Sequence, residues 1–167
     1  MNNQELIITR EFNAPITLVW EMFSTAEHLS QWWGPKGFST TVKAFTFEVG
    51  GTFHYGLIGP DASIMWGIFH YKAINKPTKL AFTNGFSNES GELVQAPEIP
   101  FGKDWPLEIM NSIQFTEQDA KTHMEMRSFP VDATPEAIQT FTENIQNMQM
   151  GFKGTFDNLE LHLKSFE

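Results

Sequence analysis

The last part of the chain carries one long apolar stripe, and this stripe limits the available folds more than any other feature. Thr134 suits an N-cap, and Pro135 and Glu136 suit the first turn of a helix. Apolar residues then recur at helical spacings of three and four, at Ile138, Phe141, Ile145, Met148, Phe152, Phe156, Leu159 and Leu163. The pattern predicts a single long helix that must bury its stripe against another layer of structure.

The residues before this stripe alternate between apolar and polar side chains with a period of two, which is typical of half-buried strands. Asn13-Ala14-Pro15 begins a helix, and Thr25 suits the N-cap of a second short helix that ends near Trp33. Gly50-Gly51 turns the second strand into the third. The expected strands are at residues 6–12, 38–49, 52–57, 64–74, 80–86, 107–115 and 122–128.

Together these elements predict an α+β protein in which a curved seven-stranded antiparallel sheet wraps around the long C-terminal helix. Two short helices follow the first strand. A twisted sheet can bury a helical stripe on its concave face. The 167 residues, 41% hydrophobic and 19% charged, suit one folded domain that spans residues 1–167.

Aromatic residues are abundant for a domain of this size: 16 Phe, 5 Trp and 2 Tyr make up 14% of the chain. On the predicted strands many of them share the phase that faces the long helix. We interpret this surplus as the lining of a groove, with a solid core as the alternative. The candidate ligand-binding residues in the groove are Phe47, Phe53, Tyr55, Phe69, Tyr71, Phe82, Ile113, Met124, Met148 and Phe152.

Two sequence features bear on access to this groove. Gly151 and Gly154 interrupt the helical stripe, which fits either a close approach of helix and sheet or room for a ligand. Residues 87–106 form a long loop of the kind that often serves as a lid, and it carries the apolar residues Leu93, Val94, Ile99, Phe101 and Trp105. The candidates for the rim or lid of the groove are Trp32, Phe86 and Trp105.

The charge and the missing cysteines exclude several function classes. The net charge is −9 with only two arginines, so we expect no surface that binds nucleic acid or an anionic membrane. The chain has no Cys, which excludes disulfides, thiolate nucleophiles and Cys-ligated metals. No signal peptide and no apolar run of membrane-spanning length is evident, so we expect a cytoplasmic protein.

No pattern of catalytic or metal-ligating residues stands out, so we predict no catalytic residue, no metal site and no cofactor. The candidate ligands fall in outward strand phases or on helix surfaces: His28, His54, His70, His123, His162, Glu48, Glu108 and Glu125. Arg10 either lies buried with a charged partner or reaches solvent at the end of its strand. The polar residues expected to face inward are Arg10, Tyr55, Tyr71, Asn111, Thr122 and Gln149.

Several ordered motifs resemble those of the START-like (SRPBCC) or helix-grip superfamily. More narrowly, they are similar to the branch of homologues of the activator of the 90-kDa heat-shock chaperone ATPase, the AHSA1-like proteins. The similarity covers about residues 6–164. The motifs that carry it are Arg10-Glu11-Phe12-Asn13-Ala14-Pro15, Gln31-Trp32-Trp33-Gly34-Pro35, Gly50-Gly51, Trp66-Gly67-Ile68-Phe69-His70-Tyr71, Leu80-Ala81-Phe82-Thr83, Trp105-Pro106-Leu107-Glu108 and Gly151-Phe152-Lys153-Gly154-Thr155-Phe156.

The resemblance implies a helix-grip fold with a deep apolar cavity between sheet and helix. It favours the binding of a small hydrophobic or aromatic molecule in that cavity. It leaves open a cyclase or aromatase that acts on a polyketide-like substrate, and a co-chaperone-like interaction module that binds a chaperone. A homodimer also stays open, because no sequence pattern argues for or against one.

Overall fold

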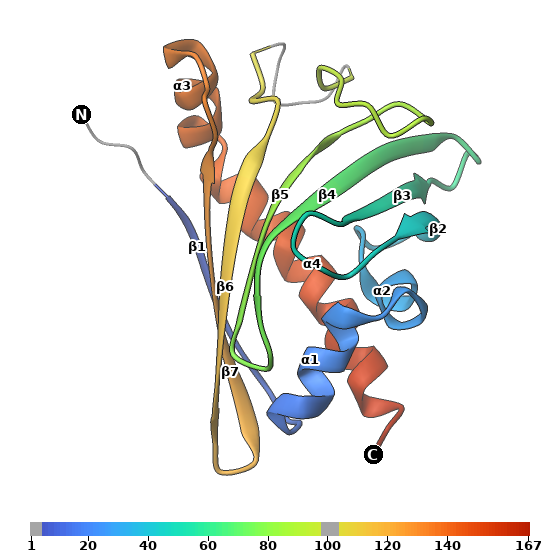
Figure 1. Ribbon diagram of the computed structural model, residues 1–167, viewed down its shortest axis with the longest axis vertical. Helices are drawn as coiled ribbons and strands as arrows, with labels where there is room; N and C mark the ends of the chain where they lie inside the picture. The colour runs from blue at the N-terminus through green and yellow to red at the C-terminus, as the bar shows by residue number, and fades with distance from the viewer. Residues whose placement is uncertain (1–4, 98–103) are drawn as a thin grey trace.

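The fold is a curved sheet wrapped around a helix, and the computed structural model describes residues 5–97 and 104–167. The seven antiparallel strands have the order β1-β7-β6-β5-β4-β3-β2, and the sheet curls around the long helix α4 (Figure 1). The predicted α+β helix-grip architecture is confirmed. The elements are β1 Leu6–Phe12, α1 Ile16–Ser24, α2 Ala26–Trp32, β2 Ser39–Phe45, β3 Thr52–Ile58, β4 Ile64–Asn75, β5 Lys79–Phe86, β6 Ile109–Gln118, β7 Lys121–Pro130, α3 Pro135–Glu143 and α4 Ile145–Lys164.

The first strand of the chain pairs with the last. Leu6 on β1 lies opposite Ser128 on β7, and Phe12 lies opposite Thr122. From β2 to β7 each strand pairs with the next one along the chain. Because side chains alternate between the two faces of a sheet, this register collects the apolar phase of every strand on the concave face, against α4.

The C-terminal apolar stripe lies on two helices, so the prediction of a single helix is wrong. α3 and α4 are separated at Asn144, whose backbone has φ −109° and ψ 11°. The Asn144 side chain donates a hydrogen bond of 2.8 Å to the carbonyl oxygen of Thr140, and such local bonds compete with regular helix geometry. The predicted start is confirmed, because the Thr134 side chain accepts a hydrogen bond from the Ala137 N–H.

The second strand ends earlier than its alternation predicts. β2 stops at Phe45, so Phe47 and Val49 lie in the connection to β3 and not on a strand. The backbone turns tightly here, and a Cβ on Gly51 would collide with the carbonyl oxygen of Thr46. Only glycine fits this close approach of two backbone segments.

Aromatic side chains fill most of the space between the sheet, the two short helices and the second half of α4. In this main core the rings of Phe69 and Phe82 stack with centroids 4.1 Å apart, and Phe23 meets Phe115 edge-on at 5.2 Å. Such pairs add to the stabilisation from apolar burial. A second, smaller core contains Leu6, Trp105, Phe141 and Met148.

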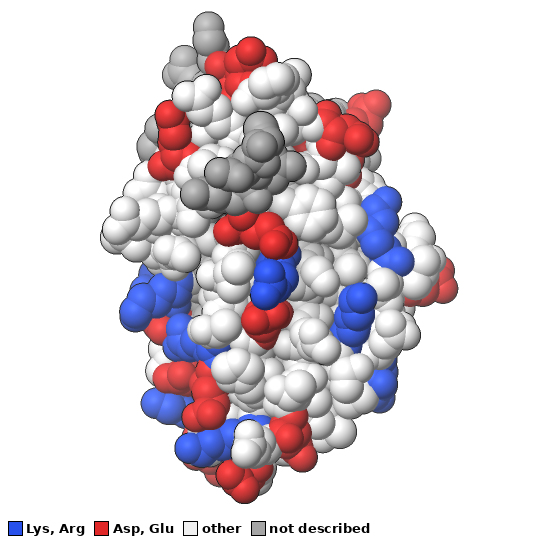
Figure 2. Space-filling view, turned by 90° about the vertical axis from the view of Figure 1, so that its left-hand side faces the viewer, with Lys and Arg blue, Asp and Glu red and all other residues white. Residues whose placement is uncertain are grey.

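The outward faces of β1 and β7 carry several paired charges. Arg127 contacts Glu125 and Glu5, with N–O distances of 3.1 and 3.3 Å, and Lys121 lies 3.7 Å from Glu11. Figure 2 shows acidic and basic side chains intermingled on this side of the molecule. Among the described residues, no helix combines the length and the apolar character needed to cross a membrane.

His54 lies on the convex face, as its strand phase predicts, but it is buried and not exposed. The turn after β5 covers it: the His54 Nε2 lies 3.1 Å from the carbonyl oxygen of Asn88, and Gly91 packs beside the imidazole ring. The first half of the predicted lid therefore covers the outside of the sheet. Residues 98–103, with the predicted lid residues Ile99 and Phe101, lie outside the described residues.

Candidate functional site

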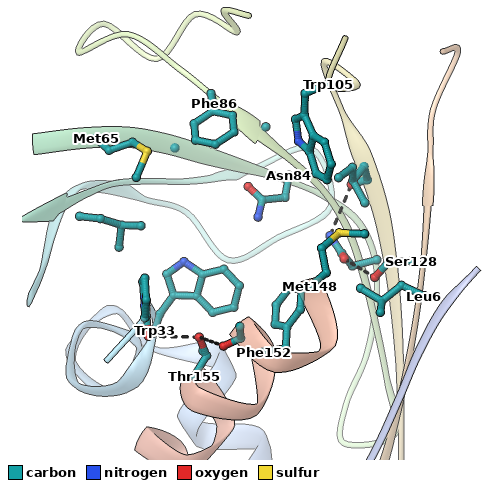
Figure 3. A pocket seen from close by; sticks show the side chains of 18 of the residues that line it. Leu6, Trp33, Met65, Asn84, Phe86, Trp105, Ser128, Met148, Phe152 and Thr155 are labelled. Atoms are coloured by element: carbon teal, nitrogen blue, oxygen red, sulfur yellow. Dashed lines mark hydrogen bonds between the residues drawn. The ribbon is translucent and has the colours of Figure 1, made fainter. Parts of the chain in front are cut away.

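A cavity of about 290 Å³ separates the two cores. It lies between the concave face of the sheet, the first half of α4 and the segment that follows α2 (Figure 3). Its lining residues are Leu6, Trp33, Gly34, Pro35, Tyr55, Leu57, Met65, Trp66, Gly67, Asn84, Gly85, Phe86, Trp105, Ile109, Asn111, Ser128, Phe141, Asn147, Met148, Gly151, Phe152 and Thr155.

Large apolar side chains make up most of the cavity wall. The indole of Trp33 separates the cavity from the main core, and its ring lies 5.0 Å from that of Phe69 and 6.2 Å from that of Phe152. At the opposite end Trp105 packs against Phe141, with ring centroids 6.0 Å apart. Figure 3 shows Phe86 on the sheet side of the same space. Such a surface favours apolar or aromatic ligands.

The sheet side of the wall also carries a polar pair that spans three strands. The Tyr55 hydroxyl on β3 donates a hydrogen bond of 3.2 Å to Oδ1 of Asn84 on β5. The bond crosses β4 at Gly67, where a Cβ would lie 2.5 Å from the Tyr55 oxygen. Glycine at this position therefore makes the pair sterically possible. Burial raises the pKa of Tyr55 to about 12, so the phenol is neutral at physiological pH.

A second polar pair lies deeper in the same wall. The Ser128 hydroxyl on β7 donates to Oδ1 of Asn111 on β6 at 2.6 Å, and the two residues are opposite each other in the register. The Asn111 Nδ2 donates to the carbonyl oxygen of Ile109 at 3.4 Å. The oxygen and the nitrogen of the buried Asn111 amide therefore each have a hydrogen-bond partner, as buried polar groups require.

On the helix side, α4 leaves open space at the cavity. A Cβ on Gly151 would meet no atom within 4 Å, so this glycine does not serve a close approach of helix and sheet. Thr155 fixes the helix nearby, because its hydroxyl lies 3.1 Å from the carbonyl oxygen of Gly34, and the Asn158 side chain donates to the same oxygen at 3.2 Å. These bonds hold α4 to the segment that carries Trp33.

The structure divides the candidate ligand-binding residues between the cavity and the main core. Tyr55, Met148 and Phe152 line the cavity, as do the rim candidates Phe86 and Trp105. The others belong to the main core and do not line it: Trp32, Phe47, Phe53, Phe69, Tyr71, Phe82, Ile113 and Met124. Strand phase gives the face on which a side chain lies, but it does not give the residue's position along the length of the groove. The part of the groove near α1 and α2 is filled by side chains of these two helices, so the strand residues there belong to the main core.

Sequence reasoning missed several lining residues, and one of them, Asn84, had a usable signal. Trp33 lines the cavity in place of its neighbour Trp32, whose indole is buried and donates to the carbonyl oxygen of Met22. Asn84 interrupts an apolar strand phase between Phe82 and Phe86. A polar residue in such a phase must be paired or must line a cavity.

The remaining inward polar candidates lie away from the cavity. Arg10 is partly buried and forms ion pairs with Asp157 and Glu160 on α4, so it has the charged partners that a buried position requires. Thr122 donates to the carbonyl oxygen of Ala14. Tyr71 lies in the main core, where its hydroxyl has no hydrogen-bond partner among the described residues, and Gln149 is exposed.

The histidines do not assemble a metal site within the described part of the chain, where no three His, Cys, Asp or Glu side chains cluster. His28 and His162 do contact each other: Nδ1 of His28 lies 3.0 Å from Nε2 of His162, where α2 packs on the end of α4. Burial, and then the charge of His28, lowers the pKa of His162.

A curved antiparallel sheet that grips a long helix around an apolar cavity defines the helix-grip class of proteins. Within that class, the chain belongs to the family of Activator of Hsp90 ATPase homolog 1-like proteins, whose sequence model matches residues 13–164. The resemblance seen in the sequence motifs is thereby confirmed.

Solved structures of bacterial proteins share this fold across nearly the whole chain. A crystal structure of a Mycobacterium smegmatis protein is 27% identical, with 95% of this chain and 90% of that chain covered and a TM-score of 0.74. A solution structure from Arthrobacter aurescens is 25% identical, with 96% and 86% covered and a TM-score of 0.78. The AHSA1 protein from Silicibacter pomeroyi is 14% identical, with 98% and 100% covered and a TM-score of 0.72, and shows the fold alone. Curated proteins give no match.

Proposed function

We propose that this protein binds a small hydrophobic or aromatic molecule in the cavity, as a single cytoplasmic domain that needs no cofactor. One observation carries the proposal. Next to α1 and α2, aromatic rings of the main core fill the groove. Beside this core a space of about 290 Å³ stays open, and other large apolar side chains line it. A concave space of this size that opens to solvent and has a mainly apolar lining is typical of a ligand site.

The size of the cavity limits the ligand. An apolar cavity of about 150 Å³ accommodates benzene. The space here is about twice as large, so it suits a molecule of two fused rings or of similar bulk. Met148 and Met65 in the wall adapt to irregular ligand shapes, because methionine has several low-energy rotamers and a polarizable sulfur.

A titration with the neutral fluorescent probe 1-aminonaphthalene, which has two fused rings, tests the proposal. We expect saturable binding to the native chain and at least tenfold weaker binding to Gly151→Phe, whose new ring enters the open space beside the helix. Met150→Phe is the matched control, because it adds the same ring one residue away at a solvent-exposed position and should leave affinity within about twofold. Absent saturation, or a G151F variant that binds like the native chain, would contradict cavity binding.

A second candidate function is a cyclase or aromatase that folds a polyketide-like substrate in the cavity. The polar pairs Tyr55–Asn84 and Asn111–Ser128 favour it, since they could orient a substrate carbonyl. The described lining offers amides and hydroxyls but no carboxylate or imidazole as a general base. Incubation with an unreduced polyketide-like chain, followed by mass spectrometry for loss of water, tests this alternative.

The third candidate, an interaction module, predicts that the chain retains a heat-shock chaperone in a pull-down.

A further inference from the structure

Asn84 is a polar group in the cavity wall whose amide nitrogen has unused hydrogen-bonding capacity. Its Oδ1 accepts from the Tyr55 hydroxyl, and within residues 5–97 and 104–167 its Nδ2 has no hydrogen-bond partner. A primary amide carries two N–H donors. Figure 3 shows the Asn84 amide projecting into the cavity beneath Phe86. The free donors are therefore presented to whatever occupies the space.

The position of this amide is fixed by its surroundings. Tyr55 holds the oxygen end of the amide from β3, and the absent side chain at Gly67 gives the phenol a path across β4. The second polar pair, Asn111 with Ser128, is closed on itself and offers less to a ligand. A preorganised donor costs little to use, because its orientation is set before the ligand arrives.

The same wall offers nothing to a charged group. No Asp, Glu, Lys, Arg or His lines the cavity in the described parts of the chain. A carboxylate transferred from water into such a site would lose its hydration without gaining a counter-ion, which is costly. An uncharged oxygen that accepts one hydrogen bond loses far less.

From these observations we infer that the cavity selects an uncharged aromatic ligand that carries one hydrogen-bond acceptor, such as a ketone or an amide carbonyl, and that Asn84 Nδ2 donates to this acceptor. The inference rests on the proposed cavity binding and adds the chemical class of the ligand. It makes Asn84 the specificity-determining residue and the aromatic walls the source of affinity.

Three naphthalenes with the same number of non-hydrogen atoms test the inference by titration calorimetry: 2-acetylnaphthalene, 2-isopropylnaphthalene and 2-naphthoate. In the native chain we expect the ketone to bind about fivefold more tightly than the alkyl compound, which corresponds to one neutral hydrogen bond. The carboxylate should bind at least tenfold more weakly than the ketone. These ratios are measured on the native chain, so they need no variant.

Two variants then assign the effect to one side chain. Asn84→Leu has nearly the same size but no donor, so the ratio of ketone to alkyl affinity should fall to about one. Tyr55→Phe keeps the Asn84 N–H donors but removes the bond that orients the amide, so the ratio should fall only part of the way, to about twofold. Because each ratio compares two ligands in the same variant, a general loss of stability does not imitate the result.

Each outcome decides one question. Equal binding of all three compounds, or a preference for the carboxylate, would overturn the selectivity while cavity binding stands. A ketone preference that persists in N84L would remove Asn84 from the recognition. If none of the three compounds binds, cavity binding fails and the selectivity fails with it.

Discussion

Arg10 stands on β1 in the phase that faces the helix, where alternation predicts an apolar side chain. Its guanidinium lies 2.6 Å from Oδ1 of Asp157 and 3.2 Å from Oε1 of Glu160, both on α4. The Arg10 side chain is 17% exposed and that of Asp157 is 24% exposed. These ion pairs connect β1 to α4. Arg10→Met should show how much they contribute to the free energy of unfolding.

Methionine keeps the apolar stem of Arg10 and removes the charge. Asp157 retains Lys36 and Lys153 at 3.3 and 3.2 Å, so the change leaves no isolated buried carboxylate. A hydrogen bond to a charged group contributes about 1.5–3 kcal/mol, whereas an exposed pair such as that with Glu160 contributes at most about 1 kcal/mol. Partial exposure favours the lower values, so we expect a loss of about 2 kcal/mol and a Tm lower by about 4–8 °C.

Urea unfolding followed by tryptophan fluorescence measures the effect, with Asp157→Asn and the double variant completing a mutant cycle. The coupling energy between the two sites should be about 1 kcal/mol or more. The reasoning would be refuted if the free energy of unfolding of R10M lay within about 0.5 kcal/mol of the native value, or if the coupling energy were near zero. Either result would show that the Arg10–Asp157 ion pair does not stabilise the packing of β1 on α4.

The pH dependence gives a second check on the same ion pair. Hydrogen bonding to Arg10, and then to the two lysines, holds the pKa of Asp157 well below its usual 3.8. A carboxyl with a lowered pKa contributes stability above its unfolded pKa and loses it as the pH falls through the folded value. The stability difference between the native chain and R10M should therefore narrow as the pH falls below about 4.

Two further predictions concern other contacts in the structure. Gly67→Ala should destabilise the fold by about 1–3 kcal/mol in urea unfolding, because its Cβ would lie 2.5 Å from the Tyr55 hydroxyl; unchanged stability would show that the phenol moves aside without cost. The lowered pKa of His162 means that stability is complete above its unfolded pKa of 6.5 and declines as the pH falls below it. His162→Gln should show a smaller drop in urea midpoint between pH 7.5 and 5.5, because it removes the partly buried imidazole, and an identical drop would exclude His162 as its source.

The fold was predictable from the sequence because a period of two determines the face on which each strand residue lies. No comparable sequence pattern tells where along the groove a strand residue lies. Phe69 and Phe86 share the concave face, yet one packs in the main core and the other lines the cavity. The break at Asn144 was missed because the apolar spacing continues through it. The burial of His54 depends on a loop that local patterning does not place.

Because β1 pairs with β7, it can join the sheet only late in the synthesis of the chain. Leu6 finds its partner only at Ser128, and Phe12 only at Thr122, so ribosomal synthesis must deliver most of the chain before the first strand can join the sheet. At about 5–20 residues per second, this delay is on the order of ten seconds. Throughout it the apolar side chains of β1 have no sheet to cover them. β1 is thus synthesised before the other six strands of the sheet but is among the last to be covered, and a nascent-chain chaperone would have its longest opportunity there.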